Sequence, residues 1–329
     1  MTKTTKIEII LNYHAGNGHA KSACKKVTNF LDQISLDYEI HLTKKDGDGV
    51  RIAKGLANQQ TPNVKIVVIG GDGTLNQCVN GVKESNYPDT PLGYIPGGSG
   101  NDFSRGIKLK IKDPVVLMQA ILSLEQPRKI DIGKATGPTF YHYFINNIGI
   151  GFDASTVYYT NHSARKEFLN KLRLGTLSYL TNLLKAIKRQ PAFVLDVDYG
   201  QNQKHFDSAY IVVATNHPYF GGGFAIDPTA NPFNHHLNLV VVKKITGMTF
   251  VKLLSKLLTD GSHLQDKNVW HIERNDFTLR NTPKQFGQMD GEELDKHEFD
   301  LHFQVDHHLF WLPIQKKLRK KLVLSHIWL

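Results

Sequence analysis

The chain has 329 residues, of which 40% are hydrophobic and 21% charged, a composition typical of globular proteins and not of disordered ones. Its length is enough for two domains. We see no signal peptide and no apolar run long enough to span a membrane, so we expect a cytoplasmic protein. With only two cysteines, Cys24 and Cys78, a disulfide framework is not expected.

The net charge is +10 and the isoelectric point is near 9.3. Such a charge favours an anionic partner, which could be nucleic acid, a nucleotide or an acidic membrane surface. Charge alone does not choose among these three.

The first 128 residues alternate predicted strands and helices, recognised by apolar runs and by apolar residues three and four positions apart. Strands are expected at Ile7–Asn12, Tyr38–Thr43, Val64–Ile69 and Leu92–Ile95, and helices at Ala20–Ile34, Gly49–Asn58, Thr74–Val82 and Asp113–Leu124. This alternation predicts an α/β N-terminal nucleotide-binding domain, residues 1–128, with a parallel sheet covered by helices on both faces.

After Pro127 the strand-like stretches follow one another without helices between most of them. They are Lys129–Ala135, Phe140–Ile148, Phe193–Tyr199, His205–Thr215, Leu237–Lys243, Val269–Glu273, Phe277–Arg280 and Phe299–Val305, with helical patterns at Lys166–Arg189 and Met248–Leu258. Apolar and acidic residues alternate in Phe193–Tyr199, as in a half-exposed antiparallel strand. We predict a mostly antiparallel β-sandwich domain over residues 129–311, with residues 312–329 as a candidate to rejoin the first domain.

Three glycine-rich turns each follow a strand of the predicted parallel sheet. They are Asn12-Tyr13-His14-Ala15-Gly16-Asn17-Gly18, Gly70-Gly71-Asp72-Gly73-Thr74 and Pro96-Gly97-Gly98-Ser99-Gly100-Asn101-Asp102. Since the carboxyl ends of parallel strands lie at one edge of a sheet, we expect the turns to converge there. Glycines let a ligand approach the backbone, and the helix N-terminus after such a turn attracts phosphate. Asp72 fits this site if Mg²⁺ lies between its carboxylate and the phosphate.

The motifs GGDGTLN, the preceding N-x-x-A-G-x-G turn, PGGSGNDF, NNIGIGFDA (Asn146–Ala154), Gly221–Phe224 and MDGE (Met289–Glu292) resemble those of the diacylglycerol kinase and sphingosine kinase superfamily. The bacterial soluble lipid kinases are the most similar branch. The resemblance implies an α/β domain and a β-sandwich with ATP and Mg²⁺ in the cleft between them. By resemblance the ATP contacts are Asn12, Gly16, Thr43, Gly70, Gly71, Asp72, Gly73, Thr74, Leu75, Asn76, Ser99, Asn101 and Asp102.

A lipid kinase needs a carboxylate to take the proton of an alcohol. The sequence Asp290-Gly291-Glu292 offers two carboxylates that could face one cleft, although Asp-Gly is also the strongest hairpin signal. The resemblance makes Asp290 the leading base candidate and Glu292 its partner or alternate.

Relatives often carry an aspartate that helps to hold a structural Mg²⁺ just before the strand at Leu237, where this chain has Asn234-His235. An amide is a weaker ligand than a carboxylate for this cation. We therefore treat Asn231, Asn234 and His236 as candidate metal contacts, together with Asp72 at the glycine turn.

The predicted function is transfer of the ATP γ-phosphate to a lipid alcohol such as diacylglycerol, with no nucleic-acid partner. We expect peripheral association with the inner face of the membrane through Lys166–Arg189 and the basic C-terminus, residues 316–329. The alternatives are a soluble NAD kinase, which shares GGDGT, and a catalytically silent lipid- or nucleotide-binding regulator. The acceptor lipid is not readable from the sequence, and a homodimer is left open.

Overall fold

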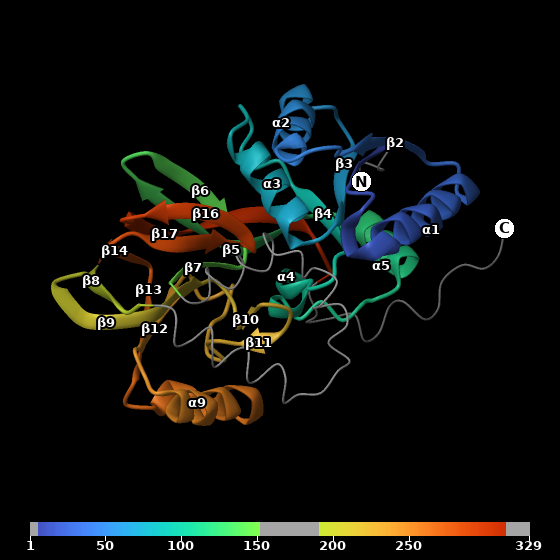
Figure 1. Ribbon diagram of the computed structural model, residues 1–329. Coiled ribbons are helices and arrows are strands. Elements are labelled where there is room, and N and C mark those ends of the chain that lie inside the picture. Colours follow the sequence, from blue (N-terminus) through green and yellow to red (C-terminus); the bar gives the residue numbers. More distant parts are fainter. Residues whose placement is uncertain (1–5, 152–190, 314–329) are drawn as a thin grey trace.

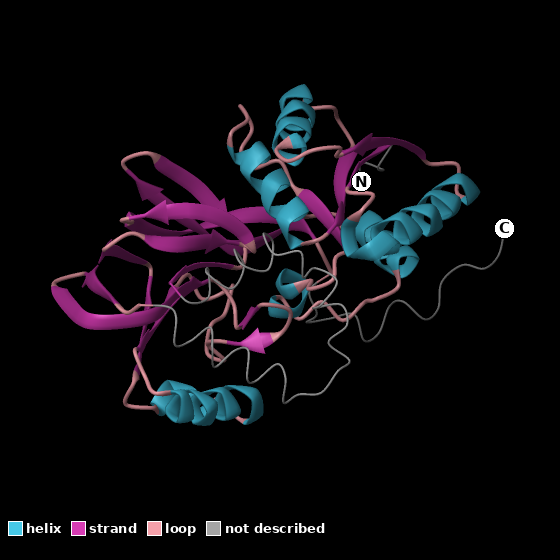
Figure 2. Ribbon diagram, viewed as in Figure 1, coloured by secondary structure: helices cyan, strands magenta, loops and turns pink. Residues whose placement is uncertain are grey.

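The computed structural model describes residues 6–151 and 191–313 (Figure 1). The predicted helix Lys166–Arg189 and the basic C-terminal segment, residues 316–329, lie outside the described residues. Helices gather around one half of the molecule, while the other half consists mainly of strands (Figure 2). The predicted fold class, an α/β domain followed by a mostly antiparallel β-sandwich, is confirmed.

Four parallel strands form the N-terminal sheet in the order β2–β1–β3–β4. Their bounds are β1 Lys6–Leu11, β2 Asp37–Leu42, β3 Val64–Gly70 and β4 Leu92–Pro96. β1 and β3 bury nearly every side chain, as strands covered on both faces do. The edge strand β2 is mostly exposed.

Two pairs of helices cover the two faces of this sheet. α1 (His19–Gln33) and α5 (Pro114–Ser123) pack on one face, and α2 (Asp48–Gln59) and α3 (Asp72–Lys83) on the other. The Asp113 side chain caps α5 by accepting hydrogen bonds from the next two free amides, as its position before Pro114 predicts. Cys24 and Cys78 are buried free thiols in opposite layers.

The second half is built from antiparallel strand pairs. The strands are β5 Arg128–Gly137, β6 Phe140–Phe144, β7 Asn147–Gly151, β8 Phe193–Tyr199, β9 Asn202–Thr215, β10 Tyr219–Phe220, β11 Phe224–Ala225, β12 Leu237–Lys243, β13 Val269–Arg274, β14 Asp276–Thr282, β15 Gln285–Met289, β16 Glu292–His297 and β17 Asp300–Trp311. Their core includes Phe277 and Phe303, whose rings stack 4.9 Å apart. The helices α4 (Asp102–Gly106) and α9 (Gly247–Thr259) lie outside this core.

β17 joins the two halves. It pairs antiparallel with β5 and β14, and its last two residues, Phe310 and Trp311, pair in parallel with Leu92 and Gly93 of β4. One continuous sheet therefore runs from the sandwich into the parallel sheet. The predicted strand Phe299–Val305 was too short, because β17 continues to Trp311 to make this contact.

The predicted strand Phe140–Ile148 is two strands, β6 and β7, in the structure. The strand is interrupted at Ile145–Asn146, because the backbone amides of these two residues donate to the Asp290 carboxylate and not to a neighbouring strand. The hairpin β15–β16, which the list of predicted strands omits, turns at Asp290-Gly291, and both of these residues have positive φ. That is the two-residue hairpin turn for which Asp-Gly is the strongest signal.

Candidate functional site

The three glycine turns meet at the carboxyl edge of the parallel sheet. Gly16 has φ 61°, and a Cβ there would lie 2.2 Å from the carbonyl oxygen of Gly97, so the first and third turns touch through bare backbone. A Cβ on Gly98 would lie 2.6 Å from the Gly71 Cα, so the third turn also touches the second. The Gly97 amide donates to the Gly70 carbonyl at 2.7 Å. Side chains at these glycines would push the turns apart.

A cavity of about 280 Å³ opens between the turns. Its lining residues are Asn12, Ala15, Gly16, Thr43, Gly71, Gly73, Thr74, Gln77, Gly98, Ser99 and Glu292. Most were predicted individually. Gln77 was not, although it lies one helical turn after Gly73 and so on the same side of α3, a spacing that could have identified it. Ala15 lies in the stretch Asn12–Gly16, which was expected as a whole to contact ATP, whereas Gly98 belongs to a quoted turn but was not singled out.

The N-terminus of α3 supplies the donors of this cavity. The helix starts at Asp72 after Gly71, and no side chain caps its first amides. Gly73 and Thr74 of its first turn line the cavity. Asn12 donates from Nδ2 to the Thr74 hydroxyl at 3.0 Å, and this bond fixes the first turn against the helix. An uncapped N-terminus of a twelve-residue helix is an anion-binding arrangement.

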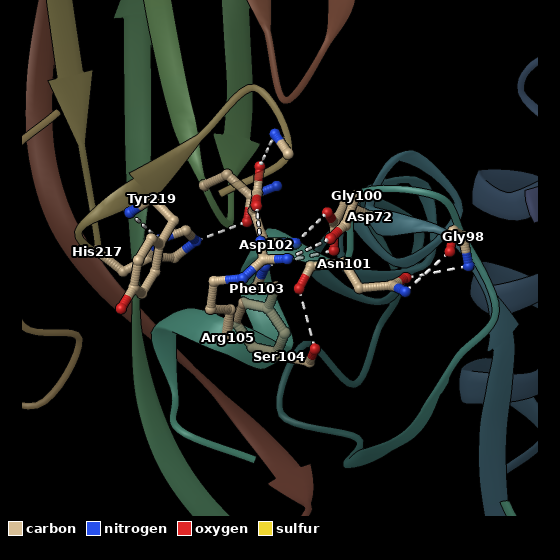
Figure 3. A network of polar contacts seen from close by, with 12 residues as sticks. Asp72, Gly98, Gly100, Asn101, Asp102, Phe103, Ser104, Arg105, His217 and Tyr219 are labelled. Atoms are coloured by element: carbon tan, nitrogen blue, oxygen red, sulfur yellow. Dashed lines mark hydrogen bonds and ion pairs between the residues drawn. The ribbon is translucent and has the colours of Figure 1, made fainter. Parts of the chain in front are cut away.

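Asp72 points toward α4 (Figure 3) and is not among the residues that line the cavity. Its carboxylate accepts from the Asp102 amide at 2.6 Å and, at 3.4 Å, from the Phe103 amide and the Tyr94 hydroxyl. The pKa of Asp72 is raised to about 6, mainly by burial; the hydrogen bond from the Asp102 amide opposes this shift and the Asp102 charge adds to it. In this position Asp72 holds α4 against the second glycine turn.

Asn101 and Asp102 shape the third turn and connect it to the sandwich (Figure 3). The Asn101 side chain accepts from the Gly98 amide at 3.0 Å and donates to the Gly98 carbonyl at 2.8 Å. Asp102 pairs with Arg105 and accepts from the Gly222 amide at 2.8 Å. Gly222 lies in the turn between β10 and β11, so this bond crosses from one half of the molecule to the other.

Gly70, Leu75 and Asn76 do not line the cavity. Gly70 ends β3 directly beneath the Thr74 side chain, and Leu75 is fully buried in the core between the sheet and α3. Asn76 donates from Nδ2 to the Tyr143 carbonyl at 2.8 Å and to Asp290 at 2.7 Å. These three residues support the cavity wall from the protein interior and do not face a ligand.

The two carboxylates of the β15–β16 turn face different surroundings. Asp290 is buried, and its two oxygens accept four N–H groups at 2.7–2.9 Å, one from the Asn76 side chain and three from the backbone. The backbone donors are Ile145, Asn146 and Asn147. Burial raises the pKa of Asp290 to about 7, while these amides act in the opposite direction. Asp290 thus ties α3 to the turn between β6 and β7.

Glu292 faces the cavity. Its Oε1 lies 3.1 Å from the position that a Cβ on Gly73 would take, so the carboxylate reaches the start of α3. Partial desolvation raises the pKa of Glu292, and the negative charge of Asp46 raises it further. Gln77 hydrogen-bonds Glu292 and opposes that shift, and it also donates to Asp46 at 2.6 Å. The expectation that Asp290 and Glu292 face one cleft therefore does not match this geometry.

The candidate metal contacts of the loop before β12 already have partners. The Asn231 carbonyl accepts from the Asn234 amide, the Asn234 side-chain oxygen accepts from the His236 amide, and its Nδ2 donates to Glu273 at 2.7 Å. The His236 ring lies 2.8 Å from the Asn234 carbonyl.

The buried Asp131 carboxylate binds this loop through His235. It lies 2.8 Å from the His235 amide and 3.0 Å from the ring Nδ1. The Asn231 and Asn234 carbonyls, the Asn234 side-chain oxygen and the Asp131 carboxylate all contact the chain's own N–H or ring nitrogen groups, an arrangement that does not fit a structural Mg²⁺ held by these oxygens.

A second, larger cavity of about 510 Å³ lies at the amino ends of β3 and β4. Glu8, Gln60, Tyr87 and Trp311 are among its lining residues. It has neither glycine turns nor a helix N-terminus after a strand, and ligands of parallel sheets bind at the carboxyl ends. We therefore place the functional site in the smaller cavity.

A parallel sheet, three touching glycine turns at its carboxyl edge and an acid on the neighbouring β-sandwich together form an arrangement suited to an anionic ligand. The chain matches the diacylglycerol kinase catalytic domain over residues 6–135 and the YegS C-terminal NAD kinase beta sandwich-like domain over residues 146–304. It belongs to this family of lipid kinases.

Among its relatives, the Bacillus subtilis (strain 168) protein named "Putative lipid kinase YtlR" is 31% identical over 86% of this chain and 92% of its own length. The diacylglycerol kinase of the same organism is 27% identical over 87% and 89%. A crystal structure described as "a putative diacylglycerol kinase from Bacillus anthracis str. Sterne" covers 95% of this chain and 99% of its own, with 23% identity and a TM-score of 0.73. That likeness shows the fold.

Within the described ranges, no helix has the length and apolar character that crossing a membrane requires.

Proposed function

We propose that the protein transfers the γ-phosphate of ATP to a hydroxyl of a membrane lipid such as diacylglycerol. The supporting observation is Glu292 on the wall of a cavity formed by three glycine turns and an uncapped helix N-terminus. Ligand pockets usually measure about 300–1,000 Å³, so this cavity suits the phosphate end of a nucleotide better than a whole one.

Glu292 is better placed than Asp290 to act as the general base. A base needs a free lone pair that faces the hydroxyl. The Asp290 oxygens are occupied by four N–H donors, whereas Glu292 opens on the cavity. In this proposal Asp290 is a positioning residue. The raised pKa of Glu292 brings it nearer to neutral pH and makes it a stronger base.

The reaction follows from these roles. The Glu292 carboxylate takes the proton of the lipid hydroxyl, the lipid oxygen bonds to the γ-phosphorus, and the bond from that phosphorus to the β–γ bridging oxygen breaks, releasing ADP. The amides of Gly73 and Thr74 and the hydroxyls of Thr43 and Ser99 hold phosphate oxygens. Mg²⁺ bound with the nucleotide would neutralise phosphate charge. Asp72 was expected to contact this cation, but its carboxylate accepts from the Asp102 and Phe103 amides and does not line the cavity, so it is assigned a positioning role.

The test is incubation of the purified protein with labelled ATP, Mg²⁺ and, separately, diacylglycerol, a sphingoid base, a polyprenol and NAD. We expect label in a lipid alcohol and its loss in Glu292→Gln. Label in NAD alone would replace the proposal with the NAD kinase alternative. Nucleotide binding without transfer to any acceptor would favour the silent regulator.

A further inference from the structure

The helix α9 carries the two most exposed large apolar side chains among the described residues. Met248 is 69% exposed and Leu258 is 57% exposed. The opposite side of α9 is buried against the sandwich through Phe250 and Leu253, and the Thr246 hydroxyl caps its first turn. The middle of the helix is thus seated on the sandwich, while Met248 in its first turn and Leu258 in its last turn are exposed.

This apolar surface continues from α9 toward the functional site. α9 packs against β11, where Phe224 is 38% exposed and its ring lies 6.2 Å from that of Phe220. β10 in turn packs against α4, and Gly222 between the two strands binds Asp102. In Figure 1 the β10–β11 hairpin lies between α9 and α4. We call Phe224, Met248 and Leu258 the α9 surface.

The net charge along α9 is positive. Residues 243–259 include four lysines and no acidic residue, and the exposed Asp260 follows them. Lys256 pairs with Asp266 at 3.0 Å, while Lys243 at the end of β12 and Lys252 on α9 are exposed. Apolar side chains bordered by lysines on an amphipathic helix fit the interface of an anionic bilayer. A purely apolar protein partner would leave these lysines without a role.

We propose that the α9 surface docks the protein on an anionic bilayer, with Met248 and Leu258 in the interface and Lys243 and Lys252 at the headgroups. The inference rests on the proposed function, since it orients the cleft beside α4 toward the membrane that would hold the acceptor. It names a different surface from the segments that the sequence suggested.

The experiment is co-sedimentation of the full chain with vesicles of phosphatidylcholine, with and without about 30 mol% phosphatidylglycerol, in the absence of ATP. We expect the double variant Met248→Glu/Leu258→Glu to lose more than about tenfold in vesicle partitioning. Val116→Glu is the matched control, because Val116 is 48% exposed on α5, and it should bind as the wild type does. Melting temperature and solution mass are measured for all variants.

Each outcome decides the inference. Equal partitioning of the double variant and the wild type overturns it, as does equal binding to vesicles with and without phosphatidylglycerol. A lowered melting temperature overturns it by showing that Met248 and Leu258 pack within the folded chain, and a lowered solution mass overturns it by showing that they pack against a second copy. If vesicle binding depends on α9 but the protein phosphorylates no lipid, the proposed function is wrong and this inference is supported.

Discussion

The glycine turns and the loop at residues 231–236 use their polar groups in opposite ways. In the turns, backbone amides and hydroxyls face a cavity. In the loop, the oxygens accept hydrogen bonds from the chain's own donors. The buried Asp131 carboxylate contacts the amide and the ring of His235. The same contrast separates Glu292 from Asp290 across Gly291. Polar groups that the fold satisfies internally hold its parts together, whereas those facing a cavity are available to a ligand.

The sharpest test of this contrast is Glu292→Gln. We expect kcat to fall by about 10² to 10⁴, the usual contribution of a general base, with an unchanged melting temperature. Asp295→Asn is the matched control, because Asp295 is exposed on the same strand and does not line the cavity. Near-normal turnover by Glu292→Gln in a steady-state assay would remove Glu292 from the mechanism.

Asp290→Ala should act mainly on stability. It leaves four buried N–H groups without their acceptor, and we expect a loss of about 3 kcal/mol in the free energy of unfolding. Urea denaturation of the variant beside Asp295→Asn measures this loss. If Asp290→Ala unfolds at the wild-type urea concentration yet has lost all turnover, Asp290 is the base and our assignment of the two acids is reversed.

Gly16→Ala tests the contact between the first and third turns. Its Cβ would meet the Gly97 carbonyl, whereas Gly18, which also has positive φ, has open space around it. Both substitutions carry the cost of a strained backbone, of about 1 kcal/mol. Only Gly16→Ala should weaken ATP binding by about tenfold or more in calorimetry. Equal weakening in both variants would mean that strain alone, and not the contact, matters.

The pH dependence of kcat/KM follows from the raised pKa of Glu292. A base must be deprotonated, so activity rises with pH, and the raised pKa moves this rise above the ordinary value of 4.5. Asp46→Asn removes a negative charge that raises the pKa, so the rise should move to lower pH by a few tenths of a unit, on the order of one neighbouring charge near solvent. A shift to higher pH would contradict this arrangement.

The smallest expected effect concerns the 231–236 loop. Without nucleotide, replacing EDTA by Mg²⁺ should leave the melting temperature unchanged, because the loop oxygens are already engaged. His235→Ala should cost about 0.5–1.5 kcal/mol, the usual net value of one hydrogen bond, because the ring is 74% exposed and the His235 amide stays bound to Asp131. A clear rise in melting temperature with Mg²⁺ would show that the loop does hold the cation.

Much of the fold was predictable because its signals are local. The strands β1 to β4 and their helices fall within one or two residues of the predicted ranges, since buried parallel strands and amphipathic helices leave strong periodic patterns. The convergence of the glycine turns followed from the geometry of parallel sheets. The break between β6 and β7 was not predictable, because its cause is Asp290, which lies 145 residues from Ile145 in the chain.

The roles of the individual acidic residues were the least predictable from the sequence. Motif positions identify Asp72, Asp102, Asp290 and Glu292, but the direction of each carboxylate depends on which amides surround it. Those amides come from α4, from the β10–β11 turn and from the break after β6, so no pattern within a motif contains this information.

The final strand β17 has a consequence for any attempt to exchange parts between relatives. Its first residues complete the sandwich, while Phe310 and Trp311 form the border of the parallel sheet beside β4. A chimera cut near residue 128 would therefore combine its β4 with a foreign terminal strand. Successful transplants should carry Leu92–Pro96 and Asp300–Trp311 from the same parent, and a fragment ending before Asp300 would expose the edge of β4 and tend to aggregate.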